Sequence, residues 1–129
     1  MTITVTDETF AGQVLNELLL EFKTEWVTVE DIISARVQQE VDSYNKRLPE
    51  FFKGLIEPSD AEKTLNGFKL KPLKKIDAEK QIYTALHAFQ NNGFFVLVDN
   101  FQSDSLQQRL ELKHNTTVSF IKLTPLVGG

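Results

Sequence analysis

The stretch TITVTDETFAGQVLNELLLEFK, residues 2–23, contains two runs of alternating apolar and polar residues joined by a polar turn with a glycine. In the first run Ile3 and Val5 alternate with threonines, which is the period of a half-buried strand. The second run alternates leucines such as Leu20 with glutamates. Together the runs predict an antiparallel hairpin. Leu19 falls among the charged residues of the second run, so we expect it to be exposed.

The spacing of the apolar residues changes from alternation to a helical period in VTVEDIISARVQQEVDSYN, residues 27–45. Thr28 is a good N-cap, and Asp31 stands where the acid of a capping box would stand. These signals predict a main helix over residues 28–45. Trp26, just before this helix, is expected in the core. The apolar residues at helical spacing are Ile33, Val37, Val41 and Tyr44.

Residues 46–92 are harder to interpret because prolines and glycines divide their first part into short pieces. Apolar residues there favour packing over a solvated linker. A second helix is predicted over 77–92, with Asp77 as its N-cap and Gly93 as its C-terminal stop. Its apolar stripe contains Ile82, Leu86 and Phe89.

Three further segments complete the predicted sheet. The run FFVLV, residues 94–98, has the length and composition of a strand, and residues 105–113 favour a short strand or a turn. The run VSFIKL, residues 118–123, is apolar on both faces and predicts a central strand. The order of elements predicts an α+β fold, with a helix on one face of a mixed sheet.

Composition excludes several classes of function. The chain has no cysteine, which excludes disulfides, thiolate metal sites and cysteine nucleophiles. Its formal net charge of −4 gives nucleic acid no general reason to bind. His87 and His114 lack a second ligand at a zinc-like spacing, and no phosphate-binding or hydrolase motif is present. We therefore expect no enzymatic activity and no metal or cofactor bound by this chain.

No run approaches the length of a membrane span, and the N-terminus has no signal-peptide pattern. We therefore expect a soluble, cytoplasmic protein without a membrane partner. The one basic cluster favours a solvated loop, with docking of an acidic partner as the alternative. Its members are Lys69, Lys71, Lys74 and Lys75.

The stretch VLVDNFQSDSLQQRLELKHNTTVSFIKLTPLVGG, residues 96–129, resembles the C-terminal part of the ubiquitin-like β-grasp family. It is similar to the sulfur carriers of thiamine biosynthesis and to the small subunit of molybdopterin synthase. Ubiquitin has the same layout from its third strand to its closing glycines. The resemblance implies one ubiquitin-like domain over 1–123 with an insertion at about 46–92, and an extended tail over 124–129. The insertion departs from ubiquitin and resembles bacterial ubiquitin-like proteins encoded beside activating enzymes.

This resemblance implies that an activating enzyme uses ATP to adenylate the carboxylate of Gly129. Because Gly128 and Gly129 lack a Cβ atom, they could pass a narrow channel in that enzyme. Pro125 would reduce the entropy lost on threading, and Leu126 and Val127 would contact the channel. Lys122 is the last basic residue before the tail. It could orient the tail against an acidic rim, although a solvated strand lysine is the simpler interpretation.

Three functions remain open from the sequence. A protein modifier would pass through thioesters to target amines, with a conjugating enzyme and a deconjugating protease as further partners. A sulfur carrier would form a C-terminal thiocarboxylate, and the uncharged sequence TPLVGG resembles the carriers. A β-grasp module that only binds partners is the third possibility. Separately, Leu19 and Leu126 could join an exposed apolar patch for partners. The length of the chain favours the modifier.

Overall fold

The computed structural model describes residues 1–59, 61–70 and 74–123, and it combines a mixed β-sheet with two helices. The chain divides into two compact units. The first is formed by Met1–Ile32 with Ala88–Gly129, and the second by Ile33–His87. No helix among the described residues is both long and apolar enough to cross a membrane. In chain order the elements are β1 (Thr2–Glu8), β2 (Val14–Glu21), β3 (Trp26–Thr28), α1 (Val29–Arg47), β4 (Ala61–Thr64), β5 (Gly67–Leu70), α2 (Ala78–Gln90), β6 (Phe94–Val98), β7 (Phe101–Gln102), β8 (Arg109–Glu111) and β9 (Thr117–Lys122).

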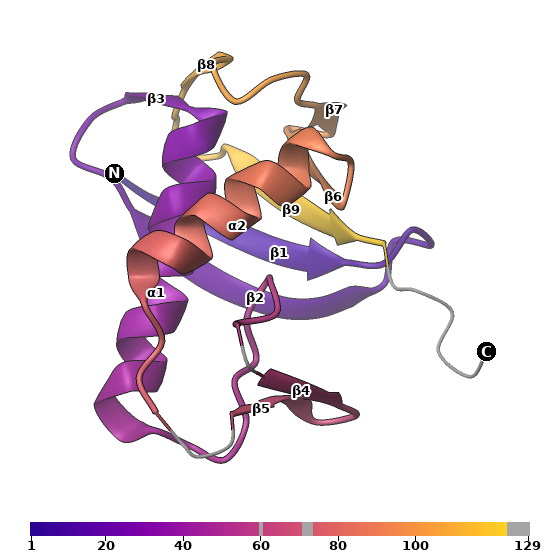
Figure 1. Ribbon diagram of the computed structural model, residues 1–129. Coiled ribbons are helices and arrows are strands. Elements are labelled where there is room, and N and C mark those ends of the chain that lie inside the picture. Colours follow the sequence, from indigo (N-terminus) through magenta and orange to yellow (C-terminus); the bar gives the residue numbers. More distant parts are fainter. Residues whose placement is uncertain (60, 71–73, 124–129) are drawn as a thin grey trace. The chain divides into compact units, whose positions relative to one another are not determined.

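The first unit contains a five-stranded sheet with the order β2-β1-β9-β6-β7 (Figure 1). β1 pairs with β2 in antiparallel orientation, as the alternation over residues 2–23 predicted. β9 lies between β1, to which it is parallel, and β6, to which it is antiparallel. The α+β class, the mixed sheet and the central position of the last strand are therefore confirmed.

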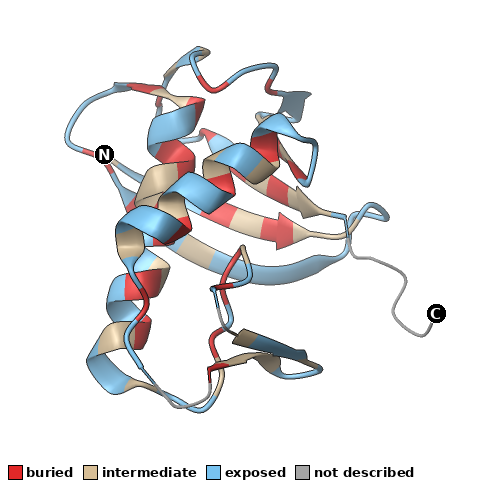
Figure 2. Ribbon diagram, viewed as in Figure 1, coloured by how far each residue is buried: buried red, intermediate tan, exposed pale blue. Residues whose placement is uncertain are grey.

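Side chains on one face of this sheet are buried, as the alternating colours of the strands in Figure 2 show. In β1, Ile3 and Val5 are almost inaccessible, whereas Thr4 between them is exposed. The ring of Phe94 lies 6.0 Å from that of Phe89 and 5.9 Å from that of Phe120. Such aromatic contacts stabilise a core beyond the area that they bury. Leu19, on β2, is 59% exposed, as the sequence predicted.

The capping box predicted for the main helix is present. The Asp31 backbone N–H donates to Thr28 Oγ1 at 3.1 Å, and the Thr28 N–H donates to Asp31 Oδ2 at 2.9 Å. The next two donors of α1, the N–H groups of Val29 and Glu30, bind the carbonyls of Gln108 and Leu106. These bonds satisfy donors that a helix start otherwise leaves unpaired.

The prediction that Trp26 lies in the core is wrong, because the side chain is 51% exposed. β3 pairs with β8, and in this short strand Val27 is the buried residue while its neighbour Trp26 faces outward. The Trp26 ring lies 5.2 Å from the guanidinium carbon of Arg109, a cation–π contact.

The second helix begins as predicted but ends by a different mechanism. Asp77 Oδ1 accepts a hydrogen bond from the Lys80 N–H at 3.2 Å, so Asp77 is the N-cap. At the other end Asn92, not Gly93, takes the left-handed conformation, with φ of 60°. The Gly93 N–H donates to the Ala88 carbonyl at 2.7 Å, which closes the last turn. α2 therefore spans 78–90 rather than 77–92.

The second unit contains a hairpin that the sequence analysis did not predict. β4 and β5 pair in antiparallel orientation, with Thr64 opposite Gly67 across a two-residue turn. On the other side of β5, Phe52 and Phe68 exchange two backbone hydrogen bonds of 2.6 and 2.8 Å. The ring of Phe52 packs edge-on against Tyr44, at 5.4 Å between centroids.

Polar side chains connect α1 and α2 to the irregular segments of this unit. Asn45 donates to the Ile76 carbonyl at 2.9 Å and accepts from the Ile76 N–H at 2.8 Å. Glu40 pairs with the buried Arg36 and accepts a hydrogen bond from the Leu55 N–H at 2.8 Å. These bonds explain how a segment rich in proline and glycine is held in a defined conformation.

Candidate functional site

The candidate site is the end of the sheet from which the C-terminal segment leaves β9. The register places Phe120 beside Asp7 of β1 and Lys122 beside Phe94 of β6. The last residues of β9 therefore lie between the end of β1 and the beginning of β6. Since β9 has a neighbour on both sides, its pairing fixes the position of Lys122, the residue before Leu123.

Three apolar side chains form a group on the less buried face of the sheet at this end, and we call this group the exit patch. It consists of Phe10, Phe95 and Ile121. Phe95 and Ile121 are register partners on β6 and β9, and both are half-buried. Phe10, in the turn between β1 and β2, is 72% exposed, and its ring packs edge-on against Phe95 at 6.1 Å. An exposed aromatic ring on apolar neighbours is typical of a protein-binding surface.

An acidic side chain borders the exit patch. Glu8 is the register partner of Ile121, and its Oε2 accepts a hydrogen bond of 2.7 Å from the Thr6 hydroxyl. Hydrogen bonds from the hydroxyls of Ser119 and Thr6 lower the pKa of Glu8 below its usual value. Hydrogen bonds to a carboxylate favour its charged form. Glu8 thus keeps a negative charge beside the apolar group.

A second acidic residue lies on the opposite, buried face. Asp7 is only 3% exposed, and its Oδ2 is 4.0 Å from the Nζ of Lys122. Lys122 is therefore not simply a solvated strand lysine, which was the simpler interpretation from the sequence. The pair connects the end of β1 to the last residue of β9.

The residues predicted to form the reactive tail lie outside the described part of the chain. They are Pro125, Leu126, Val127, Gly128 and Gly129. Leu123, the last described residue before them, is 37% exposed. Leu19 lies on β2 opposite Thr4, and Thr4 is the β1 partner of Thr117, the first residue of β9. Leu19 is therefore at the other end of the sheet from the exit patch.

The remaining predicted residues occupy separate places. His87 is in α2, stacked on Tyr83 at 6.3 Å, and His114 is in the turn after β8. Among the described residues, no three His, Asp or Glu side chains are grouped so that they could hold a metal ion. In the basic cluster, Lys69 Nζ lies 3.4 Å from Glu50 Oε1, and Lys71 is outside the described residues.

The sequence patterns did not indicate the aromatic part of the site. Residues 7–12, DETFAG, are predicted as a turn from Asp7 and Gly12, and the large apolar residue Phe10 is not singled out. Gly12 does lie in the turn, with a φ of 87°, but Asp7 and Glu8 belong to β1, so the turn begins later than predicted. An aromatic residue in a polar hairpin turn was the available signal.

No protein-family model, curated protein or solved structure matches the chain.

Proposed function

We propose that this protein is a ubiquitin-like modifier with a β-grasp fold that is joined to target amines through the carbonyl carbon of Gly129. The observation that carries the proposal is the position of β9. This strand returns to the centre of a mixed sheet, parallel to β1, and leads directly into the sequence LTPLVGG. The hairpin β1–β2 followed by helix α1 supports the same fold.

The proposed chemistry has three steps, and enzymes supplied by partners catalyse each of them. The Gly129 carboxylate, free directly or after removal of any residues that follow, attacks the α-phosphorus of ATP, and pyrophosphate leaves. A partner's thiolate then attacks the acyl-adenylate carbonyl and expels AMP. Finally a target amine attacks the thioester, releasing the thiol and forming an amide bond. Because the chain contains no cysteine, the thiols belong to the partners.

The composition of residues 124–129 suits entry into an adenylating site. The acyl-adenylate must be protected from water, so the site has to close around the chain. Gly128 and Gly129 allow that closure because they have no Cβ atom. Pro125 restricts φ, which lowers the entropy lost on binding. Leu126 and Val127 supply apolar contacts.

The exit patch supports the proposal as a docking surface. A partner that acts on Gly129 must also hold the folded domain, because six residues alone offer little contact area. Phe10 and its neighbours lie where the segment leaves the sheet, so one partner could contact both. Glu8 adds a negative charge that a basic partner surface would complement.

The test is co-expression of the chain with the genes that neighbour it in its genome, followed by detection of covalent adducts on denaturing gels. We expect ATP-dependent adducts of higher mass for the wild type. Deletion of Gly129 should abolish them, and Gly128→Val should block threading through its branched Cβ. Both variants should remain folded, because the changes lie beyond β9. Unchanged adducts in either variant would overturn the proposal.

A sulfur carrier is the second candidate, favoured by the uncharged sequence TPLVGG. In that function sulfide, rather than a partner's thiol, would attack the acyl-adenylate carbonyl and expel AMP, which leaves a C-terminal thiocarboxylate. The same co-expression would then yield an intact chain in which one C-terminal oxygen is replaced by sulfur, without higher-mass adducts. If neither product formed, the remaining function would be that of a module that only binds partners.

A further inference from the structure

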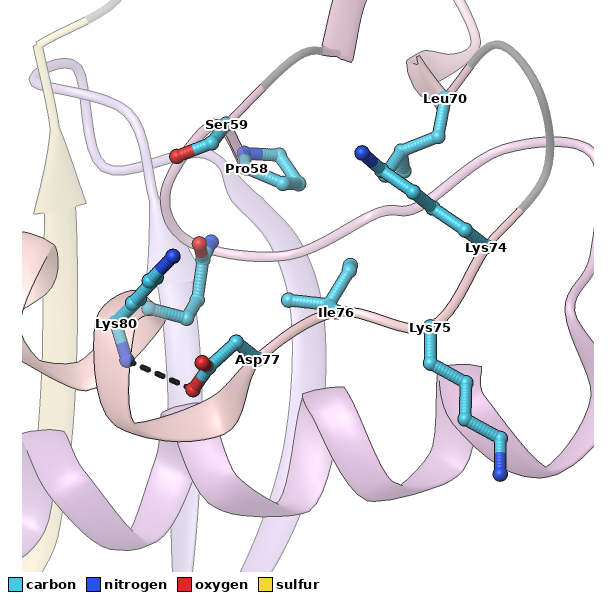
Figure 3. Close-up of a pocket in the computed structure, with 9 residues that line it drawn as sticks. Pro58, Ser59, Leu70, Lys74, Lys75, Ile76, Asp77 and Lys80 are labelled. Carbon is cyan, nitrogen blue, oxygen red and sulfur yellow. Dashed lines mark hydrogen bonds between the residues drawn. The ribbon is translucent and has the colours of Figure 1, made fainter.

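The second unit contains a small hollow beside the start of α2. Its volume is about 180 Å³, and it is bounded by residues 58–59, the end of β5, and residues 74–77 and 80–81 (Figure 3). The side chains of Pro58, Leu70 and Ile76 are buried and form an apolar part of its wall. The proposed conjugation chemistry makes no use of this hollow.

The remainder of the wall carries more basic than acidic side chains. Lys74, Lys75 and Lys80 line the hollow, and Asp77 is the one acidic residue among the described lining residues. The Asp77 carboxylate already accepts the Lys80 backbone N–H as the N-cap of α2. Figure 3 shows Lys74 extending across the hollow toward Pro58 and Leu70, and Lys80 extending toward Ser59. Lys75 points in the opposite direction.

We propose that this hollow binds the phosphate group of a small phosphomonoester. Two ammonium groups, the Ser59 hydroxyl and the positive end of the α2 dipole all favour an anion here. A phosphomonoester presents three acceptor oxygens and carries close to two negative charges at neutral pH, whereas a carboxylate has two oxygens and one charge. The apolar wall would contact the organic part of the ligand.

The test is a titration of the full chain at constant ionic strength, with inorganic phosphate, phenyl phosphate and acetate as probes. Binding is measured from the NMR chemical shifts of the backbone amides. We expect saturable shifts at Ser59, Lys80 and Gln81 with both phosphates. Phenyl phosphate should bind at least threefold more tightly than inorganic phosphate, because its ring reaches the apolar wall. Acetate should bind at least tenfold more weakly than inorganic phosphate.

Variants of single lysines provide a matched comparison. Lys74→Ala and Lys80→Ala should each weaken phosphate binding at least fivefold. Lys75→Ala removes the same charge from a side chain that points away, and it should change the affinity less than twofold. Circular dichroism checks that each variant is folded. Non-saturable shifts, equal binding of acetate, or an equal loss in Lys75→Ala would overturn the proposal.

Discussion

At the scale of single residues, Thr28 and Asp31 determine where the main helix begins. Each side chain accepts a hydrogen bond from the other residue's backbone N–H, at 3.1 and 2.9 Å. This reciprocal arrangement depends on both side chains. The backbone carbonyls of Leu106 and Gln108, which precede β8, also accept hydrogen bonds from this helix start.

Thr28→Ala should lower the free energy of unfolding by about 1 kcal/mol, because the Asp31 N–H loses its acceptor. Urea denaturation measures the change. Asp31→Ala should produce a similar loss, and the double variant should lose less than the sum, because the two bonds form one unit. Strictly additive losses would contradict the capping box.

Glu8 provides a test of the hydrogen bonds that border the exit patch. Its pKa in the folded protein is lowered from 4.5 by the Ser119 and Thr6 hydroxyls. Since the unfolded chain binds this proton more tightly, the stability that Glu8 contributes is present above about pH 4.5 and is lost as the pH falls through the folded pKa. Ser119→Ala should therefore raise the pKa of Glu8 in an NMR titration. An unchanged pKa in this variant would exclude the Ser119 hydroxyl as the cause.

At the scale of secondary structure, local patterns predicted the long elements and only one of the short ones. Alternating or helical spacing identified β1, β2, α1 and α2, and apolar runs of strand length identified β6 and β9. β8 lies within residues 105–113, a segment predicted as a short strand or a turn, whereas the very short strands β3 and β7 depend on their pairing with β8 and β6. The boundaries of α1 and α2 moved by one or two residues, which is usual for helix ends.

The hairpin β4–β5 shows a different reason for failure. β4 has the sequence AEKT, which has no apolar alternation that would predict a strand. It forms because β5 is held on its other side by Phe52, a tertiary contact. Asn66-Gly67 was a partial local signal, since this dipeptide favours a hairpin turn, although the turn residues are Leu65 and Asn66 and Gly67 is the first residue of β5.

Asn45 tests how the irregular part of the second unit is held. Its amide makes two hydrogen bonds with the backbone of Ile76, just before α2. Asn45→Ala should cost about 1–3 kcal/mol of stability, because it leaves two partly buried backbone groups without these bonds. Hydrogen exchange at Ile76 is the specific measurement, and it should accelerate. Asn45→Asp keeps an acceptor for the Ile76 N–H and should retain part of the protection.

At the scale of the whole molecule, the fold brings together residues that no local pattern connects. The exit patch joins a turn near residue 10 to strands at residues 95 and 121, and this depends on the parallel pairing of β1 with β9. The sequence could therefore point to the Gly-Gly end, but not to the apolar surface near the end of β9. The residues of that end, 124–129, lie outside the described part of the chain.

Phe10→Ala should separate partner recognition from stability. The side chain is 72% exposed, so its removal should change the free energy of unfolding by less than about 1 kcal/mol. If the exit patch is the docking surface, adduct formation should fall at least tenfold. Phe101→Ala is the matched control, because Phe101 is 79% exposed on β7, at the edge of the sheet. Equal activity of the two variants would exclude the exit patch as a docking surface.

The most direct measurement of the central claim is mass spectrometry of tryptic peptides from cells that express the chain with its neighbouring genes. Cleavage after Lys122 leaves residues 123–129 on any modified amine. We predict branched peptides in which a target lysine carries Leu-Thr-Pro-Leu-Val-Gly-Gly through the Gly129 carbonyl. They should be absent when Gly129 is deleted. Failure to find such branches, while the intact chain retains an unmodified Gly129 carboxylate in the presence of its partners, would contradict the proposed function.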